Sequence, residues 1–426
     1  MSESYRRRHS RWYEVILFNF WFQVIIGFLF VVLLPQWLRY GGVVDSLTLT
    51  IGSNSNTLYA NTVAFLLSLI VIRQMHQFPG SRTIAFLFPT IAASWLLVIA
   101  TLFFLRADYA RSILAMSYIF ANLWAICGFF IGRRYYTTKL ALLPFGNISE
   151  LKAHPHINTN VLKVPNLENR RYDAVVADLQ SEIPAEWLKF LAECTLARIP
   201  VYDAKQLTER VTGRVKLNTL SENIYGVLYP SPIYELVKRW IEFLAVLITA
   251  PLWLPIMLIT GIIIKLESPG SMFFTQNRVG LGNQDFTVYK LRSMCQNSEK
   301  EGAQFAKAND MRITRVGKFI RKTRIDEIPQ FLNVLKGDMS LIGPRPEQRT
   351  FVEQFEKEIS FYAYRHVVRP GITGWAQVTQ GYAADTDETR IKLEHDFYYI
   401  KHFSLWLDIL IVFKTIKTML TGFGAR

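Results

Sequence analysis

Asp326 and Glu327 form an adjacent acidic pair at the end of a strongly basic segment. Lys318, Arg321 and Arg324 recur every three residues in that segment, which predicts a helix with these cations on one face. Fixed cations beside two carboxylates suit phosphate chemistry, because they balance the charge of a phosphorylated substrate. The pattern also fits a solvated network of ion pairs, so the pair alone leaves both interpretations open.

Two further basic elements lie in the same third of the chain. One is Lys290-Leu291-Arg292-Ser293-Met294, and the other is Gly343-Pro344-Arg345-Pro346. Because Arg345 stands between two prolines, its backbone has little freedom to lose and its guanidinium can be aimed at a phosphate. Together these elements favour a phosphate-binding site over a solvated ion network.

Four apolar runs in the first third of the chain are long enough to cross a membrane. They lie at about 13–34, 59–76, 83–105 and 112–132. Hydrophobic residues make up 50% of the chain and charged residues only 19%, which is typical of a membrane protein. We therefore predict a four-helix transmembrane bundle over residues 1–135.

The basic residues that flank these runs predict their orientation. Three clusters are expected on the cytoplasmic side: Arg6, Arg7, Arg8 and Arg11; Arg73 and Arg82; Arg133, Arg134 and Lys139. An even number of crossings then leaves everything after about residue 135 in the cytoplasm. The chain is thus predicted to be a multi-pass membrane protein with its chemistry on the cytoplasmic face.

A fifth apolar run extends from Phe243 to Ile264, and a full crossing there would export the rest of the chain. The run contains Pro251 and Pro255, each of which removes a backbone donor and disturbs the preceding turn. We predict a helix break and a re-entrant hairpin that enters and leaves by the same face. The alternative is a proline-kinked helix that crosses the membrane.

Between these regions, short β patterns alternate with helical patterns from about 141 to 225. This alternation predicts a small parallel α/β domain of Rossmann-like type over residues 136–230. No G-x-G-x-x-G follows any of its strands, so a structural or oligomerising role is favoured over dinucleotide binding. The third domain, 231–426, is expected to combine the re-entrant helix with a mainly α-helical catalytic part. Near its end, residues 405–420 predict an amphipathic interfacial helix or a helix packed in a bundle.

The overall composition limits the partners and the metal chemistry. Lys and Arg number 48 against 34 Asp and Glu, which gives a formal net charge of +14 and suits anionic partners. Cys127, Cys194 and Cys295 are scattered without metal-ligand spacing, so we interpret all three as packing residues.

The run from Lys238 to the C-terminus resembles the bacterial polyprenyl-phosphate sugar-1-phosphate transferases, the monotopic enzymes that initiate polysaccharide and glycoconjugate assembly. The resemblance rests on the proline-containing hairpin and on five motifs, at 290–294, 326–330, 333–340, 343–346 and 370–377. The four-helix prefix and the α/β domain resemble the long-form branch, which includes undecaprenyl-phosphate galactose and glucose phosphotransferases. One departure is Ala250, where many members have serine before the hairpin proline.

The resemblance implies a two-step phosphoryl transfer from a UDP-sugar or other nucleotide sugar to undecaprenyl phosphate. Asp326 would be the nucleophile and Glu327 would hold Mg²⁺ or Mn²⁺. The implied phosphate-binding residues are Lys290, Arg292, Arg321, Arg324 and Arg345. Membrane lipids are the other expected partners, a homodimer is left open, and the sequence does not name the sugar.

Three alternatives come from other classes of protein. A nucleic-acid-binding regulator would use the basic helix but has no need of the acidic pair, so we expect no nucleic acid. A transporter would carry ionisable residues inside its membrane spans, and the four runs are nearly free of them. A non-catalytic membrane scaffold of glycan assembly is the alternative that only a turnover measurement separates from the enzyme.

Overall fold

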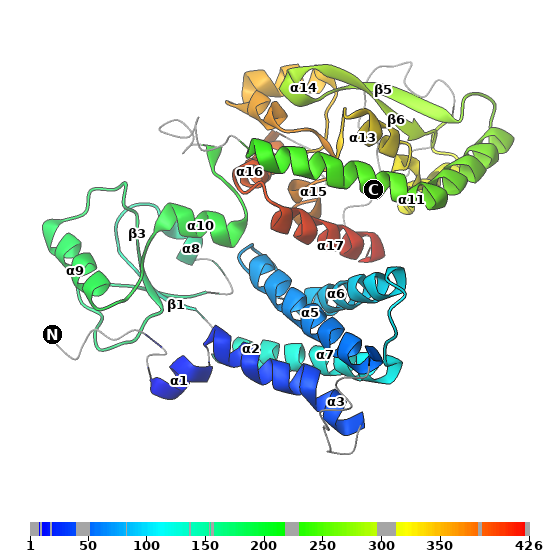
Figure 1. Cartoon of the computed structure of the whole chain (residues 1–426). Coiled ribbons are helices and arrows are strands. Elements are labelled where there is room, and N and C mark those ends of the chain that lie inside the picture. Colours follow the sequence, from blue (N-terminus) through cyan, green and yellow to red (C-terminus); the bar gives the residue numbers. More distant parts are fainter. Residues whose placement is uncertain are drawn as a thin grey trace. The chain divides into compact units, whose positions relative to one another are not determined.

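The computed structural model describes residues 8, 11–17, 19–39, 52–81, 83–135, 138–152, 154, 157–217, 230–295, 312–381 and 386–421. The chain divides into two compact units, Met1–Thr212 and Gly213–Arg426. Helices dominate the described parts of both units, and the strands form small sheets (Figure 1). Arg6, Arg7 and Arg82 lie outside the described residues, as do residue 136 and residues 218–229 near the predicted domain boundaries.

The first unit begins with the short helix α1 (Trp12–Leu17) and four long apolar helical segments. The first segment combines α2 (Phe20–Phe28), the π-helix η1 (Leu29–Leu33) and α3 (Leu34–Arg39). The others are α5 (Gly52–Met75), α6 (Ile84–Phe104) and α7 (Arg111–Tyr135). All four are long and apolar enough to cross a membrane, which confirms the four predicted apolar helices.

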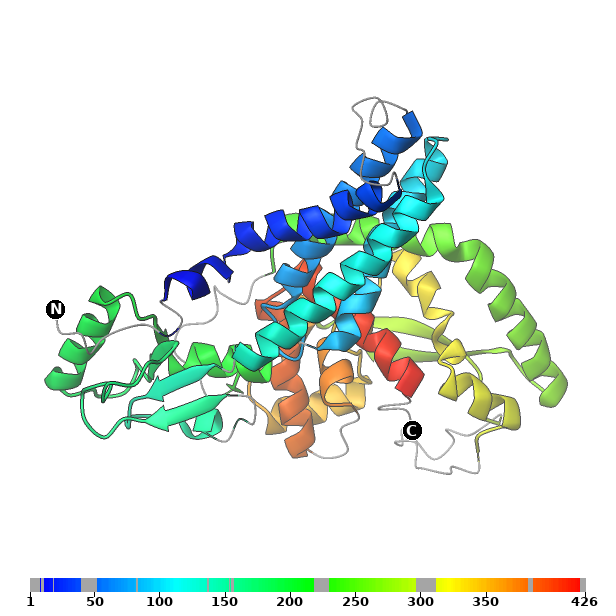
Figure 2. The same cartoon turned by 90° about the horizontal axis from the view of Figure 1, so that it is seen from below.

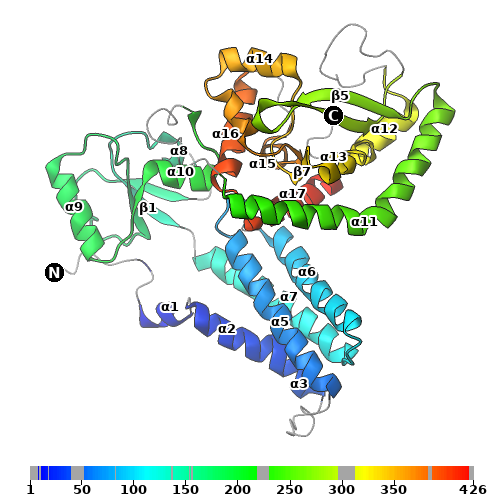
Figure 3. The ribbon, with the colours of Figure 1, turned by 45° about the horizontal axis from the view of Figure 1, so that its top comes forward.

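These helices pack through small and aromatic side chains, and α5 and α6 run side by side (Figures 1 and 3). Val31, Phe65, Ile91 and Trp95 are buried in their shared core. Buried hydroxyls are bonded to backbone carbonyls; for example, Ser117 Oγ donates to Val31 O at 2.7 Å. Such pairing is compatible with a membrane interior, where no water is available to these hydroxyls.

The remainder of the first unit is a parallel α/β structure. Its strands are β1 (Lys139–Leu142), β2 (Asn158–Val161), β3 (Ala174–Ala177) and β4 (Val201–Asp203), in the order β2-β1-β3-β4. All three strand pairs are parallel, as the alternating pattern predicts. The helices are α8 (Ser149–Lys152), α9 (Ala185–Leu196) and α10 (Ala204–Thr212). The Rossmann-like comparison stays a prediction.

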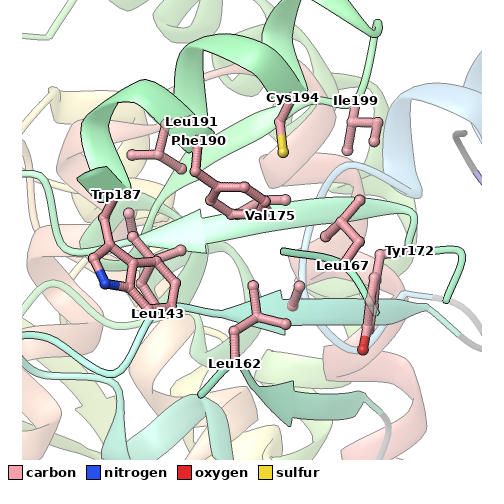
Figure 4. Close-up of a cluster of buried hydrophobic side chains, with 12 residues drawn as sticks. Leu143, Leu162, Leu167, Tyr172, Val175, Trp187, Phe190, Leu191, Cys194 and Ile199 are labelled. Carbon is pink, nitrogen blue, oxygen red and sulfur yellow. The ribbon is translucent and has the colours of Figure 1, made fainter. Parts of the chain in front are cut away.

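Alternate residues of the central strands belong to two separate hydrophobic cores, one on each face of this sheet. On one face, Trp187, Phe190 and Cys194 of α9 pack against Leu143 and Val175 (Figure 4). The other face is covered by residues of α8 and α10. Cys194 is therefore a packing residue as predicted, whereas Cys127 and Cys295 are exposed, and the prediction was wrong for those two.

The second unit opens with α11 (Pro232–Glu267), a fifth helix that is long and apolar enough to cross a membrane. Pro251 and Pro255 lie inside it, and the helix bends along its length (Figures 2 and 3). The Trp253 indole donates to the Val246 carbonyl at 3.0 Å, so a side chain satisfies one acceptor near the prolines. The predicted helix break is thus a bend within one continuous helix.

The rest of the second unit alternates short strands and helices. The hairpin β5 (Phe273–Val279) and β6 (Asp285–Leu291) is antiparallel, and β7 (Ser340–Ile342) pairs in parallel with β8 (Gly371–Thr373). The first helices are α12 (Arg315–Lys322), the 3-10 turn η4 (Ile325–Glu327) and α13 (Gln330–Lys336). They are followed by α14 (Arg349–Glu358), the 3-10 helix η5 (Tyr362–Val367), α15 (Trp375–Thr379), α16 (Thr386–Lys401) and α17 (Leu405–Thr421).

α17 carries apolar residues on its buried side and on its exposed side. Leu407, Leu410 and Ile411 are buried, whereas Val412 and Ile416 are exposed. The helix therefore packs in the second unit, as predicted for a helix in a bundle, and the alternative of an interfacial helix stays a prediction.

Candidate active site

The acidic pair lies in η4, the turn that follows the basic helix α12. α12 ends at Lys322, and Arg324 then adopts a left-handed conformation with φ 60°. Because the chain changes direction there, Arg324 does not continue the helical face that carries Lys318 and Arg321. The predicted three-residue spacing on one helix is therefore wrong for Arg324, although its side chain still reaches the site.

Glu327 is buried and lies among three cations. Its Oε1 is 3.1 Å from Arg345 Nη2 and 3.5 Å from Lys290 Nζ, and its Oε2 is 3.7 Å from Arg324 Nη1. Burial alone would raise the pKa of this carboxyl, but Arg345, Lys290 and Arg324 outweigh it and hold the pKa down at about 2. Glu327 is thus a permanently charged acceptor that gathers cations from β6, the turn and the Arg345 segment.

Asp326 has a different environment, although it is the next residue to Glu327. It is buried, and its Oδ1 has no hydrogen-bond partner among the described residues. Burial and the charge of Glu327 raise its pKa to about 6, against the opposing effect of Lys290, Arg321 and Arg345. A carboxylate whose charge is poorly stabilised and whose oxygen is free has the properties of a nucleophile or a metal ligand.

Arg321 reaches the site from α12 and is fixed by a neighbour. Its Nε donates to Ser293 Oγ at 2.8 Å, and its charge lowers the pKa of Asp326. α12 can approach this segment because residue 317 is glycine: a Cβ on Gly317 would lie 2.0 Å from Ser293 O. The Lys290–Met294 segment and the basic helix are therefore packed backbone to backbone beside the acidic pair.

Arg292, which we predicted to bind phosphate, lies elsewhere. Its Nη1 donates to Pro269 O at 2.7 Å, and its Nη2 donates to Ser268 O at 2.7 Å and to Ser268 Oγ at 2.9 Å. These bonds tie the end of β6 to the segment that follows α11. The structure therefore gives Arg292 a structural position, because its guanidinium is held by acceptors of the segment that follows α11.

Lys290 lies on β6, and Asn333 of α13 holds that strand in place. The amide of the fully buried Asn333 accepts from Tyr289 N at 3.1 Å and donates to Thr287 O at 2.7 Å. The Asn333 side chain thus makes the backbone hydrogen bonds that a neighbouring strand would otherwise make with β6. Burial lowers the pKa of the Lys290 ammonium to about 8, in spite of the opposing charge of Glu327.

Arg345 is positioned by an unusually close approach of two chain segments. A Cβ on Gly343 would lie 2.4 Å from Arg369 O, and a Cβ on Gly371 would lie 2.0 Å from Gly343 N. Gly374 has the same restriction, because a Cβ there would lie 2.2 Å from Gly343 O. The glycines of the two motifs at 343–346 and 370–377 are thus explained by one contact, which places Arg345 beside Glu327.

The site thus brings together the acidic pair and four of the five predicted cations: Lys290, Arg321, Arg324 and Arg345. This arrangement can neutralise a diphosphate while leaving one carboxylate oxygen available to react. Asn333 belongs to the motif at 333–340, but the motif does not reveal its contacts with β6. The buried Arg365, which donates to Arg345 O and is paired with Asp396, belongs to none of the motifs. Their roles depend on contacts between distant segments, which no local pattern records.

Comparison with known proteins shows which family this chain is similar to. The family model described as "Bacterial sugar transferase" matches residues 233–422. The chain is 57% identical over 428 residues to the UDP-N-acetylgalactosamine-undecaprenyl-phosphate N-acetylgalactosaminephosphotransferase of Aeromonas hydrophila, with 99% of this chain and 100% of the relative covered. It is 44% identical over 183 residues to the UDP-glucose:undecaprenyl-phosphate glucose-1-phosphate transferase of Xanthomonas campestris pv. campestris, with 42% and 37% covered.

A third relative matches a shorter part of the chain. The putative undecaprenyl-phosphate N-acetylgalactosaminyl 1-phosphate transferase of Bacillus subtilis is 50% identical over 132 residues, which cover 31% of this chain and 74% of that protein. The fold, the site and these relatives together define the class of protein, a membrane-associated sugar phosphotransferase. The chain belongs to the bacterial sugar transferase family, that of the undecaprenyl-phosphate sugar-1-phosphate transferases.

Proposed function

We propose that this enzyme transfers N-acetylgalactosamine 1-phosphate from UDP-N-acetylgalactosamine to undecaprenyl phosphate. The choice of sugar is supported by the Aeromonas hydrophila relative, which matches from end to end, whereas the Xanthomonas campestris glucose enzyme matches less than half of this chain. The observation that carries the chemistry is the buried Asp326, whose free oxygen lies beside a glutamate surrounded by cations.

The proposed reaction has two steps at one phosphorus atom. A carboxylate oxygen of Asp326 bonds to the phosphorus next to the sugar, and the bond from that phosphorus to the nucleotide oxygen breaks, so UMP leaves with the electron pair. A phosphate oxygen of undecaprenyl phosphate then bonds to the same phosphorus and displaces the Asp326 carboxylate. The product is a lipid diphosphate sugar, and the enzyme is regenerated.

Lys290, Arg321 and Arg345 have the charges and positions to assist both steps. Each lies close enough to the acidic pair to shift the pKa of Asp326 downward, so each would also act on a phosphoryl group bound there. Because they are fixed before the substrate arrives, they stabilise developing charge without reorganisation. Arg324 is more exposed and would contact the outer part of the substrate.

The residues present fit a hard divalent cation. Mg²⁺ takes oxygen ligands and commonly uses one or two carboxylates together with substrate phosphates. Glu327 and the free Oδ1 of Asp326 supply such oxygens, although the described residues hold no group of three or more His, Cys, Asp or Glu side chains that could hold a metal. When bound, Mg²⁺ or Mn²⁺ would supply further positive charge to the diphosphate.

We also propose that the active site faces the cytoplasm and that α11 is re-entrant in the bacterial inner membrane. Basic residues flank both ends of its apolar part, Lys238 and Arg239 on one side and Lys265 on the other. The first part of α11 is also attached to the catalytic region by buried polar contacts. Glu242 accepts from Ser340 Oγ at 2.8 Å, and Lys238 forms an ion pair with Asp408 of α17.

Turnover with a panel of nucleotide sugars tests the proposed function. Purified protein in lipid nanodiscs is incubated with undecaprenyl phosphate and the UDP derivatives of N-acetylgalactosamine, N-acetylglucosamine, galactose and glucose, and UMP release is measured. The proposal predicts release with UDP-N-acetylgalactosamine that depends on the lipid acceptor. Preferred turnover of another sugar would overturn the choice of substrate, and no release with any of them would overturn the reaction.

A further inference from the structure

We propose that Arg365, held by Asp396, is a positioning residue that fixes Arg345 in the active site. The inference rests on the proposed function, because it assigns a purpose to the placement of Arg345 beside Glu327. Arg365 lies in η5 and Asp396 in α16, and neither belongs to the motifs that suggested the site.

The segment that carries Arg345 is held through its backbone carbonyls. Each of the four consecutive carbonyls from Pro344 to Glu347 accepts a hydrogen bond from another segment of the second unit, and two of the four donors are neighbours on β5. The donors are, in order, Gly371 N, the Arg365 guanidinium, the Arg278 guanidinium and Val279 N. Two of the four residues are prolines, so the segment has few donors of its own, and its conformation depends on these acceptor contacts.

The donor to the Arg345 carbonyl is itself fixed from two sides. Arg365 Nη2 lies 2.9 Å from Arg345 O and 2.8 Å from Asp396 Oδ2, while Nη1 donates to Tyr362 Oη at 2.7 Å. Both charged side chains are almost fully buried, with 3% of Arg365 and 2% of Asp396 exposed. The planar guanidinium thus donates to Tyr362 Oη and Arg345 O while its charge is paired with that of Asp396, a combination that a lysine ammonium cannot reproduce.

Stability alone is a weak reason for such a pair. The cost of removing two charges from water often equals or exceeds their attraction, so a buried ion pair adds little to folding free energy compared with apolar residues. What the pair does provide is a fixed direction for the carbonyl of the residue whose guanidinium lies 3.1 Å from Glu327. A displacement of about 1 Å in a catalytic group can reduce the rate by about 100-fold.

A double-mutant cycle between the two arginines tests the inference. Arg345→Ala, Arg365→Lys and the double variant are compared with wild type for kcat and KM in UMP release. We expect Arg365→Lys to lower kcat by about 100-fold with little change in KM. In the Arg345→Ala background, the same substitution should lower kcat by less than about 3-fold, because no guanidinium remains to be positioned. Arg349→Lys, which changes an arginine bonded to Asn283 and Asp285, is the matched control and should retain activity.

The outcomes separate the inference from its premises. Equal fold losses from Arg365→Lys in both backgrounds would show a merely structural role and overturn the inference. Folding of Arg365→Lys is judged by circular dichroism and size-exclusion elution, and Asp396→Asn provides a second test if that variant does not fold. The loss of kcat caused by Asp396→Asn should likewise be much smaller in the Arg345→Ala background than in the wild type. Absence of wild-type turnover would instead overturn the proposed function, and full activity of Arg345→Ala would overturn the role of Arg345.

Discussion

Arg345 Nη2 lies 3.1 Å from Glu327 Oε1, and this contact joins two segments that are separated by the whole of α13 and β7. It fixes the charge of Glu327 and brings a guanidinium to the edge of the free Asp326 carboxylate. The two carboxylates are neighbours in sequence, yet their surroundings move their pKa values in opposite directions. Glu327 is therefore the charged residue that holds the cations, and Asp326 is the less stabilised and more reactive carboxyl group.

Glu327→Gln should reduce turnover by about 100-fold or more, because the charge that gathers three cations and supports a divalent ion is lost. Asp326 remains, so residual activity should rise when Mg²⁺ is increased from 1 to 50 mM in assays buffered to about constant ionic strength. Excess chelator should abolish wild-type UMP release, and added Mg²⁺ should restore it. Undiminished wild-type turnover in chelator would remove the metal role given to Glu327.

The first half-reaction should have a bell-shaped pH profile. Asp326 must be ionised to attack, and its pKa is raised to about 6, so activity should fall as the pH falls through that value. Lys290 must be charged to bind phosphate, and its pKa is lowered to about 8, so activity should fall as the pH rises through that value. UMP release is measured without lipid, so that the acceptor phosphate does not titrate.

Lys290→Arg identifies the group on the alkaline side of that profile. Arginine stays charged throughout this pH range, so the alkaline fall should disappear or move upward while the acid side stays near 6. An alkaline side that does not move in this variant would show that Lys290 is not the titrating group.

Gly371→Ala should destabilise the second unit and lower turnover. Its new Cβ would lie 2.0 Å from Gly343 N, so the backbone that leads to Arg345 must shift. The check is the apparent thermal midpoint in detergent together with kcat. Gly128→Ala is the control, because nothing lies within 4 Å of the corresponding Cβ. Equal midpoints for the two variants would contradict the close packing of the two glycine motifs.

The topology can be tested with a native thiol. Replacing Cys127 and Cys194 with serine leaves Cys295, which is exposed, as the remaining cysteine of three. If α11 is re-entrant, a membrane-impermeant maleimide should label Cys295 in inverted membrane vesicles and not in intact spheroplasts. Asp108→Cys, in the loop between α6 and α7, is the control and should label with the opposite preference. Labelling of Cys295 in spheroplasts would mean that α11 crosses the membrane.

The sequence was sufficient for features that depend on local pattern. The apolar runs predicted the membrane helices, and the alternation of short β patterns with helical patterns predicted the parallel sheet that contains Val175. The three-residue spacing gave the wrong position for Arg324, because Arg324 is left-handed and the helix ends before it. The positive charge of Arg292 suggested a phosphate contact, but its acceptors are Ser268 and Pro269 of another segment. Local periodicity in the sequence predicts neither a left-handed residue after a helix nor the hydrogen-bond acceptor that a side chain finds in a distant segment.

The contacts that support the site could not be predicted from the sequence for a related reason. Asn333 acts by completing β6 from a helix, and Arg365 acts by bonding a carbonyl 20 positions away. Polar residues of these types are usually exposed, and only their burial in the folded chain reveals their function. The pKa difference between Asp326 and Glu327 likewise arises from groups that folding assembles.

A covalent adduct on Asp326 tests the central claim most directly. Wild-type protein is incubated with UDP-N-acetylgalactosamine labelled with ³²P at the phosphorus next to the sugar, in the absence of undecaprenyl phosphate, and its peptides are mapped by mass spectrometry. We predict a phosphosugar on Asp326 that is chased into lipid product when undecaprenyl phosphate is added, and no adduct or turnover in Asp326→Asn. Lipid product formed by Asp326→Asn, or by wild type without any labelled peptide, would contradict the covalent mechanism.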